Sequence, residues 1–125
     1  MYRQLAIDID LVPLLPKICG AAGLARKAGK LTVGGAQSEE AIRAGKAVLV
    51  LLSSDLSDNA AKKLHNAMKT HGVPYLKLPL GKEELAAACG KGSYATACAL
   101  CDSGFAEILY RLPGVSDGAV KHESK

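Results

Sequence analysis

The chain has 125 residues, 49% of them hydrophobic, which is the size and composition of one globular domain. Four Tyr, one Phe and no Trp argue against a binding surface of stacked aromatic platforms, which many single-strand nucleic-acid binders use. The net charge is +4, and much of it falls within residues 17–46, where only Glu39 and Glu40 oppose the cations Lys17, Arg26, Lys27, Lys30, Arg43 and Lys46. This local excess fits a phosphate-facing patch, although solvated helix faces explain most charge runs.

Nothing in the sequence indicates export or a membrane. Asp8, Asp10 and Pro13 interrupt the one apolar stretch near the N-terminus, and no apolar run has the length of a membrane span. We therefore expect a soluble, cytoplasmic protein without a membrane partner. The four cysteines lack the spacing of a secreted disulfide framework and are expected to be reduced thiols: Cys19, Cys89, Cys98 and Cys101.

The first half of the chain alternates helical and extended patterns. Apolar residues at helical spacing predict a helix over 11–28, which Gly29 ends. A short edge strand over 30–33 follows, and Gly34 and Gly35 then open a helix that closes at Gly45. The uninterrupted apolar run 47–52 predicts a central strand buried on both faces, with Val48 and Val50 inside it.

The second half continues the alternation. Ser57 caps a predicted helix whose apolar face holds Ala60, Leu64, Met68 and His71. The remaining predicted elements are a strand over 75–79, a short helix over 82–89, a strand over 94–100 and a last helix over 102–111. This order predicts an α/β fold: a single-domain, three-layer α/β/α sandwich around a mixed or parallel sheet of about four strands. We expect the domain to cover residues 1–112 and residues 113–125 to form a flexible C-terminal tail.

Several segments resemble catalytic or metal-binding motifs but lack residues that those motifs require. The segment 23–31 has the wrong glycine spacing for a phosphate-binding P-loop, and Leu31 stands where a magnesium-binding hydroxyl is required. Cys98 and Cys101 form a lone C-x-x-C pair without a second pair to complete a metal site, and Cys98 is better explained as a small buried side chain. Ser53, Ser54 and Asp55 read as a turn and helix-capping run. We expect no enzymatic activity, metal, cofactor or small-molecule substrate.

The stretch from Gly23 to Ala47 carries the clearest functional signal. A basic helix end, a short connector and a double glycine lead directly into a second helix. The start of that helix offers unpaired backbone N–H groups and a positive dipole end to an anion. A tight strand-to-helix turn is the plainer explanation of Gly34 and Gly35.

Taken together, the motifs over Gly20–Arg111 resemble the kink-turn-binding ribosomal protein superfamily, most closely its small bacterial ribosomal-protein-like branch. The resemblance rests on LARKAGKL, VLVLLSSDLSDN, VPYLKL, GKEELAAACGKG and DSGFA. It implies a non-enzymatic protein that binds sharply bent RNA through the start of the second helix and the loop before the last strand. Ribosomal or other noncoding RNA is the implied partner, with the ribosome a candidate location.

The family's motif at that helix is Gly, a small residue, Asn, Glu and, three positions later, Lys. Here the corresponding positions hold Gly34, Gly35, Ala36, Gln37 and Glu40. The two glycines keep close backbone approach, and Gln37 keeps an amide that can reach a base edge. Ala36 lacks a polar side chain and Glu40 replaces a cation. Electrostatic compensation is expected from four nearby cations: Arg26, Lys27, Lys30 and Arg43.

The second contact region that the resemblance implies is the loop formed by Lys91, Gly92, Ser93 and Tyr94. Family members commonly carry an apolar, small-residue loop there, whereas this loop is polar. Two functions therefore remain open. One is a module that binds structured RNA by shape, backbone contacts and a few base-edge hydrogen bonds. The other is a protein-interaction module of the same fold, associated with the translation machinery.

Overall fold

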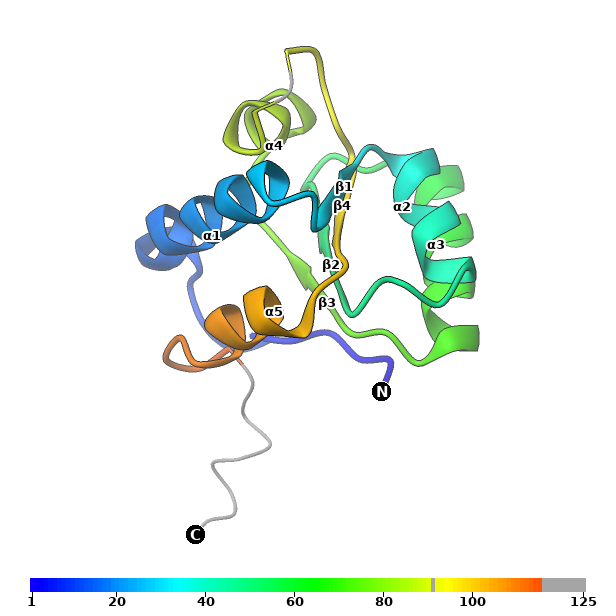
Figure 1. Ribbon diagram of the computed structural model, residues 1–125, viewed down its shortest axis with the longest axis horizontal. Coiled ribbons are helices and arrows are strands. Elements are labelled where there is room, and N and C mark those ends of the chain that lie inside the picture. Colours follow the sequence, from blue (N-terminus) through cyan, green and yellow to red (C-terminus); the bar gives the residue numbers. More distant parts are fainter. Residues whose placement is uncertain (91, 116–125) are drawn as a thin grey trace, which may run out of the picture.

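The sheet of this protein is covered by helices on both faces, as Figure 1 shows. The structure is a computed structural model that describes residues 1–90 and 92–115. A 3₁₀ turn, η1, precedes the first helix. In chain order the elements are η1 Val12–Leu14, α1 Leu15–Lys27, β1 Leu31–Val33, α2 Gly35–Arg43, β2 Leu49–Leu52, α3 Asp58–His71, β3 Tyr75–Lys77, α4 Lys82–Ala88, β4 Ala97–Leu100 and α5 Ser103–Tyr110.

The four strands form one mixed sheet in the order β1-β4-β2-β3. Strand β4 is antiparallel to both β1 and β2, whereas β2 and β3 run parallel. Val50 lies opposite Ala99 on one side and Tyr75 on the other, so β2 is interior. The sequence prediction of a mixed four-stranded sheet with β1 at its edge is confirmed.

Two apolar clusters lie on the two faces of the sheet. Helices α2 and α3 cover one face, where Ile42, Leu64 and Met68 pack against Val50. Helices α1, α4 and α5 cover the other, where Ile18 and Leu85 belong to a larger cluster with residues of β2, β3 and β4. Because side chains alternate along a strand, β2 and β4 supply residues to both clusters. The predicted α/β/α sandwich is therefore confirmed.

Three expectations need correction: the burial of Val48, the start of the last strand and the burial of His71. Val48 is only half-buried and lies in the bend before β2, which begins at Leu49. The last strand begins at Ala97 rather than at Tyr94, because the chain from 92 to 96 turns across the end of the sheet. His71 is exposed, since α3 ends there and Gly72 takes up a left-handed conformation with a φ of 68°.

The packed part of the chain extends past residue 112. Val115 is fully buried, and its carbonyl accepts a hydrogen bond of 3.0 Å from the backbone N–H of Ala6. The proposed boundary between 112 and 113 is therefore too early, because Val115 belongs to the folded unit. Residues 116–125 of the expected tail lie outside the described residues.

Candidate nucleic-acid interface

The start of α2 is open to a ligand. Gly34 immediately precedes the helix with a φ of 118° and a ψ of 151°, a conformation that disfavours any residue with a side chain. Its N–H donates to the carbonyl of Ala97 at 2.8 Å, which anchors the helix start to β4. No side chain caps α2. The N–H groups of its first turn and the positive end of the helix dipole can therefore act together on an anion at this point.

The loop before β4 lies directly against this helix start. A Cβ atom added to Gly35 would come within 2.9 Å of Oγ1 of Thr96. Thr96 in turn accepts a hydrogen bond of 2.9 Å at its carbonyl from the N–H of Ser53, the first residue after β2. Three segments that are far apart in the sequence therefore meet at one end of the sheet, as the resemblance implied for two of them.

A cavity of about 420 Å³ opens between the starts of α2 and α3, and we call it the α2–α3 hollow. Small side chains form much of its wall, and polar groups enter it from both helices. Its lining residues are Gly35, Ala36, Glu39, Ser57, Asn59, Ala60, Lys63, Leu64 and Thr96. Of the predicted site residues with described positions, Gly35 and Ala36 alone line this hollow.

The remaining predicted residues of α2 are spread along the helix. Gln37 is exposed in the first turn, and Glu40 is exposed further along. Arg43 lies in the last turn, where its Nε is 3.0 Å from Oε2 of Glu39. Because a helix rises about 1.5 Å per residue, Arg43 is roughly 12 Å along the axis from Gly35. Arg43 is therefore a neutralising partner of Glu39 and not a cation at the helix start.

The cations at the end of α1 have different surroundings. Arg26 donates a hydrogen bond of 2.8 Å from Nη1 to the carbonyl of Cys89, at the end of α4. Lys27 and Lys30 are exposed. The Arg26 side chain thus holds α4 in place, whereas the two lysines are free to face solvent or an anion.

The second predicted contact loop is exposed where it is described. Gly92, Ser93 and Tyr94 are all exposed, and Lys91 lies outside the described residues. The Tyr94 ring is 59% exposed, and Nζ of Lys82 lies 5.2 Å from its centroid. This aromatic ring and ammonium group are available together at the surface.

The loop after β2 is braced against the start of α4. Oδ2 of Asp55 accepts a hydrogen bond of 3.2 Å from the N–H of Lys82, and this bond is the main cause that lowers the pKa of the Asp55 carboxyl. Ser54 donates from its hydroxyl to the carbonyl of Leu80 at 3.1 Å. These contacts support the interpretation of Ser53, Ser54 and Asp55 as a turn, with Ser57 capping α3 as predicted.

Sequence reasoning missed the residues that α3 and β4 contribute to the α2–α3 hollow. Asn59, Lys63 and Thr96 line it, together with the Glu39 carboxylate. The polar run that ends in Asn59 can be seen in the sequence. Its position beside α2 arises only when α2 and α3 pack together, and some twenty residues separate the two contact points in the chain. A local sequence pattern does not predict such a contact.

The cysteines do not form a shared ligand set. Cys98 is fully buried in the cluster under α1, α4 and α5, as expected of a small apolar side chain, whereas Cys101 packs on the opposite cluster. The Sγ atoms of Cys89 and Cys98 lie 3.1 Å apart. Among residues 1–90 and 92–115, no group of three His, Cys, Asp or Glu side chains is placed to hold a metal ion.

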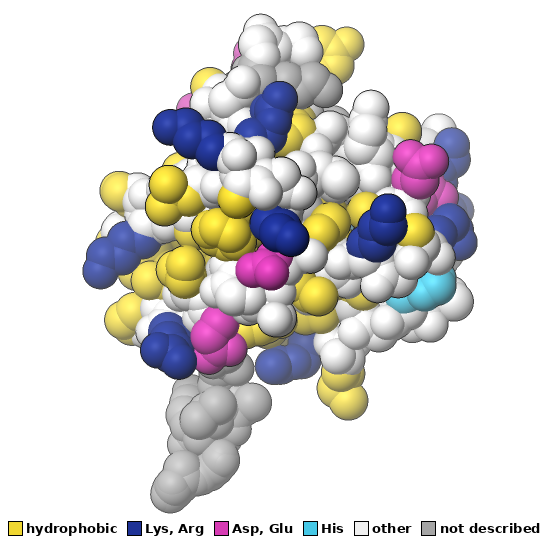
Figure 2. Space-filling model, in the orientation of Figure 1, with side chains coloured by type: hydrophobic (Ala, Val, Ile, Leu, Met, Phe, Trp, Pro, Cys, Tyr) yellow, Lys and Arg dark blue, Asp and Glu magenta, His cyan; other side chains and the backbone are white. Residues whose placement is uncertain are grey.

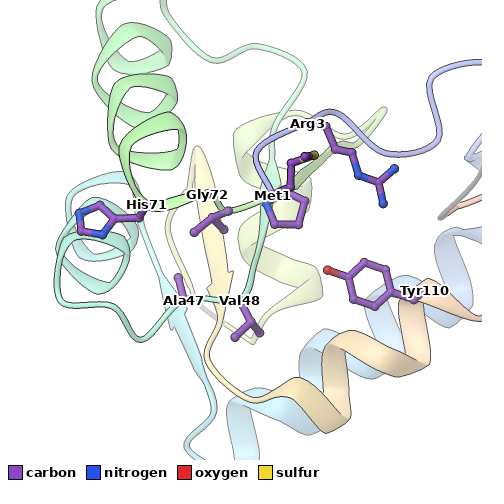
Figure 3. Close-up of a pocket in the computed structure, with 9 residues that line it drawn as sticks. Met1, Arg3, Ala47, Val48, His71, Gly72 and Tyr110 are labelled. Atoms are coloured by element: carbon purple, nitrogen blue, oxygen red, sulfur yellow. The ribbon is translucent and has the colours of Figure 1, made fainter. Parts of the chain in front are cut away.

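A second cavity of about 590 Å³ lies at the other end of β2, beside residues 47 and 48 that precede the strand. Figure 3 shows the Tyr110 hydroxyl and the Arg3 guanidinium directed toward its interior, while the His71 ring points away from it. None of the predicted site residues that the structure describes lines this cavity.

Comparison with known proteins shows which family this fold belongs to. Residues 17–110 match the ribosomal protein L7Ae/L30e/S12e/Gadd45 family, and this match spans all elements from α1 to α5. The chain belongs to that family. The resemblance inferred from the sequence motifs is therefore confirmed, and residues 1–16 form an N-terminal extension to the L7Ae-family match.

Individual relatives support this assignment. The chain is 37% identical over 90 residues to the RNA-binding protein YlxQ of Bacillus subtilis strain 168, covering 72% of this chain and 88% of that protein. A Bacillus halodurans protein of unknown function has a structure with a TM-score of 0.66 at 30% identity, covering 73% of this chain and 90% of that one. The first of these names describes an RNA-binding protein.

The fold extends to a distant RNA-binding protein. The Giardia lamblia 15.5kD RNA binding protein superposes with a TM-score of 0.66 at 23% identity, over 82% of this chain and 90% of that one. At this identity the comparison establishes the shared fold. In the part of the chain that the structure describes, the helices are too short or too polar to cross a membrane.

Charges of both signs surround the interface. Figure 2 shows acidic side chains at the upper right, over the helix pair α2 and α3, with basic side chains beside them, and charges of both signs among hydrophobic side chains over α1 and α5. Glu39 and Glu40 of α2 are among the acidic residues of that pair. An anionic ligand at the start of α2 would therefore depend on backbone N–H groups as well as on cationic side chains.

Proposed function

We propose that this protein is a non-enzymatic, ribosomal-protein-like RNA-binding protein that recognises structured RNA of the kink-turn type. The single observation that carries this proposal is the uncapped start of α2, held beside Thr96 and the α2–α3 hollow by Gly34 and Gly35. Family membership and the naming of the Bacillus subtilis relative as an RNA-binding protein support RNA as the ligand.

Different groups at the helix start are suited to different parts of the RNA. Backbone N–H groups of the first turn of α2 bind phosphate oxygens, since glycine precedes them and no side chain caps them. Gln37, exposed in the same turn, can both donate to and accept from a base edge. Lys27 and Lys30 add attraction for the RNA backbone from the end of α1.

A bent RNA suits this surface better than a straight duplex. The base edges of an A-form helix are difficult to reach, whereas a bend exposes bases and brings its two stems to one site. The α2–α3 hollow lies beside the helix start and offers Asn59 and Ser57 as polar groups. We therefore propose that the ligand is ribosomal or other noncoding RNA in the cytoplasm, with the ribosome as a place of action.

Titration of a kink-turn RNA and a straight duplex of equal length tests this proposal. Wild type should prefer the kink-turn RNA. Glu40→Lys should strengthen binding by replacing repulsion with attraction, and Ala36→Asn should add base discrimination of about 1 to 3 kcal/mol. Gly35→Val should impair binding, because its branched side chain would occupy the space beside Thr96 and obstruct the N–H groups.

Salt dependence provides a second readout of the same proposal. If exposed cations neutralise phosphates, the logarithm of the association constant falls linearly with that of salt concentration. Lys30→Ala should reduce the slope by about one. Arg111→Ala, which removes an exposed cation from the end of α5 outside residues 17–46, is the matched control.

The protein-interaction alternative has one specific observation in its favour. The Glu39 carboxylate lines the α2–α3 hollow, and acidic side chains are unusual at a phosphate site. Equal affinity of wild type and all variants for both RNAs, without dependence on salt, would contradict the RNA proposal. That result would assign the hollow to a protein partner of the translation machinery.

A further inference from the structure

The N-terminal extension forms the outer border of the sheet. The N–H of Leu5 donates to the carbonyl of Tyr75 at 2.8 Å, and the N–H of Tyr75 donates to the carbonyl of Arg3 at 3.0 Å. Gln4 pairs with Tyr75 in parallel orientation, on the side of β3 that faces away from β2. This pairing adds a surface that the family match, which begins at residue 17, does not include.

The extension places the Tyr2 ring against α3. The Tyr2 hydroxyl is hydrogen-bonded to Nδ1 of His65 at 2.9 Å, and the two rings meet edge to face with centroids 6.0 Å apart. The Tyr2 ring also lies 5.8 Å from that of Tyr75. Both tyrosines and His65 are half-buried, so this aromatic cluster reaches the surface.

Lysines of α3 and β3 surround this cluster. Nζ of Lys69 lies 6.0 Å from the centroid of the Tyr2 ring, and Lys77 is exposed on β3. Burial and the positive charges of Lys77 and Lys69 together lower the pKa of His65. Lys62 is exposed two helical turns before Lys69, on the same outer side of α3. We call Lys62, Lys69, Lys77 and Tyr2 the α3 basic surface.

The positive charge of the α3 basic surface is not neutralised by neighbouring side chains. Within residues 1–90 and 92–115, the two ion pairs join Arg43 to Glu39 and Arg111 to Glu107, and neither involves these lysines. Asp58, in the first turn, is the acidic residue of α3. Unpaired ammonium groups on an exposed helix complement the phosphates of a nucleic acid.

The α3 basic surface continues from the α2–α3 hollow. Lys63 and Asn59 line the hollow, and Lys62 lies further around the exposed side of the helix, beyond Asn66. With 14 residues, α3 is about 20 Å long, enough to follow several phosphates of an RNA stem. We infer that the α3 basic surface is a second RNA-contact surface, which binds the backbone of a stem that leaves the bend held at α2. This inference rests on the proposed function.

Three kink-turn RNAs separate this inference from the primary site. One is trimmed close to its bend, and each of the other two has a different stem extended by a full helical turn. The double variant Lys62→Ala with Lys69→Ala keeps helix-forming residues and removes two charges. The control Arg3→Ala with Arg111→Ala removes two exposed cations outside residues 17–46, one from the N-terminal extension and one from the end of α5.

We expect the α3 double variant to bind an extended RNA at least tenfold more weakly at low salt, with a salt slope smaller by about two. Its affinity for the trimmed RNA should match that of wild type and of the control. If the α3 double variant keeps the wild-type salt slope on both extended RNAs and binds the trimmed RNA normally, this inference alone is overturned. Failure of wild type to bind any of the RNAs would overturn the proposed function as well.

Discussion

The guanidinium of Arg26 donates a hydrogen bond of 2.8 Å to the backbone carbonyl of Cys89 and thereby joins the end of α1 to the end of α4. This carbonyl stands one residue before Gly90, where the chain enters the loop that leads to Thr96. A cation predicted from sequence to contact RNA therefore has a structural partner.

Arg26→Ala should lower the free energy of unfolding by about 1 kcal/mol, because the Cys89 carbonyl loses a charge-assisted partner. Backbone amides in the described part of 90–96 should exchange faster with solvent. Lys27→Ala removes a neighbouring exposed charge and should stay within about 0.5 kcal/mol of wild type. Chemical denaturation and hydrogen exchange measure both effects. Equal stability of the two variants would show that the hydrogen bond contributes nothing.

Gly35→Ala should destabilise the fold by about 1 to 3 kcal/mol, since its Cβ would lie 2.9 Å from Oγ1 of Thr96. Thr96→Ala in the same chain removes that oxygen and should recover most of the loss. A double-mutant cycle from denaturation curves gives the coupling between the two positions. Additive effects would mean that the loop and the helix start are not in contact.

Cys98→Val should cost more stability than Cys98→Ala, although valine is the more hydrophobic residue. The Cys98 Sγ lies 3.1 Å from that of Cys89 in a fully buried cluster, so a second branch on Cβ has no free space. Overpacking costs about 1 to 3 kcal/mol. Thermal and chemical denaturation compare the variants, and a more stable Cys98→Val would refute tight packing between β4 and the end of α4.

His65 should make stability decrease as the pH falls below about 6.5, the ordinary value for histidine. Burial, aided by Lys77 and Lys69, lowers the pKa of His65 in the folded state, so the unfolded chain takes up the proton first. Above the ordinary pKa, His65 is neutral in both the folded and the unfolded chain and therefore adds nothing to the pH dependence of stability. Denaturation at about pH 7.5 and about pH 5.5, on either side of that value, should show a smaller difference for His65→Gln than for wild type. An identical difference would contradict the assigned environment.

Local patterns predicted most of the fold. The apolar run before Ser53 identified the interior strand, and the Ser57 cap and Gly72 stop located α3 within a residue at each end. The predicted start of the last strand at Tyr94 was wrong, because β4 begins at Ala97 and Thr96 lies against Gly35 at the start of α2. Tertiary contact here overrides strand propensity.

The candidate site was less predictable than the fold. The glycines at the start of α2 signalled an open helix terminus, since only local conformation is needed to recognise one. The α2–α3 hollow requires two helices to pack side by side, and the partner of Arg26 is 63 residues away in the sequence. Pairing of residues 3–5 with β3 likewise carries no local signal.

That pairing has a consequence for the solubility of the protein. A sheet edge with free N–H and C=O groups is a template for self-association, and β3 is the edge that the N-terminal extension covers. β1, the opposite edge, offers only three residues for such pairing. Removal of the first residues should therefore promote aggregation through strand addition, even where every helix of the family match remains intact.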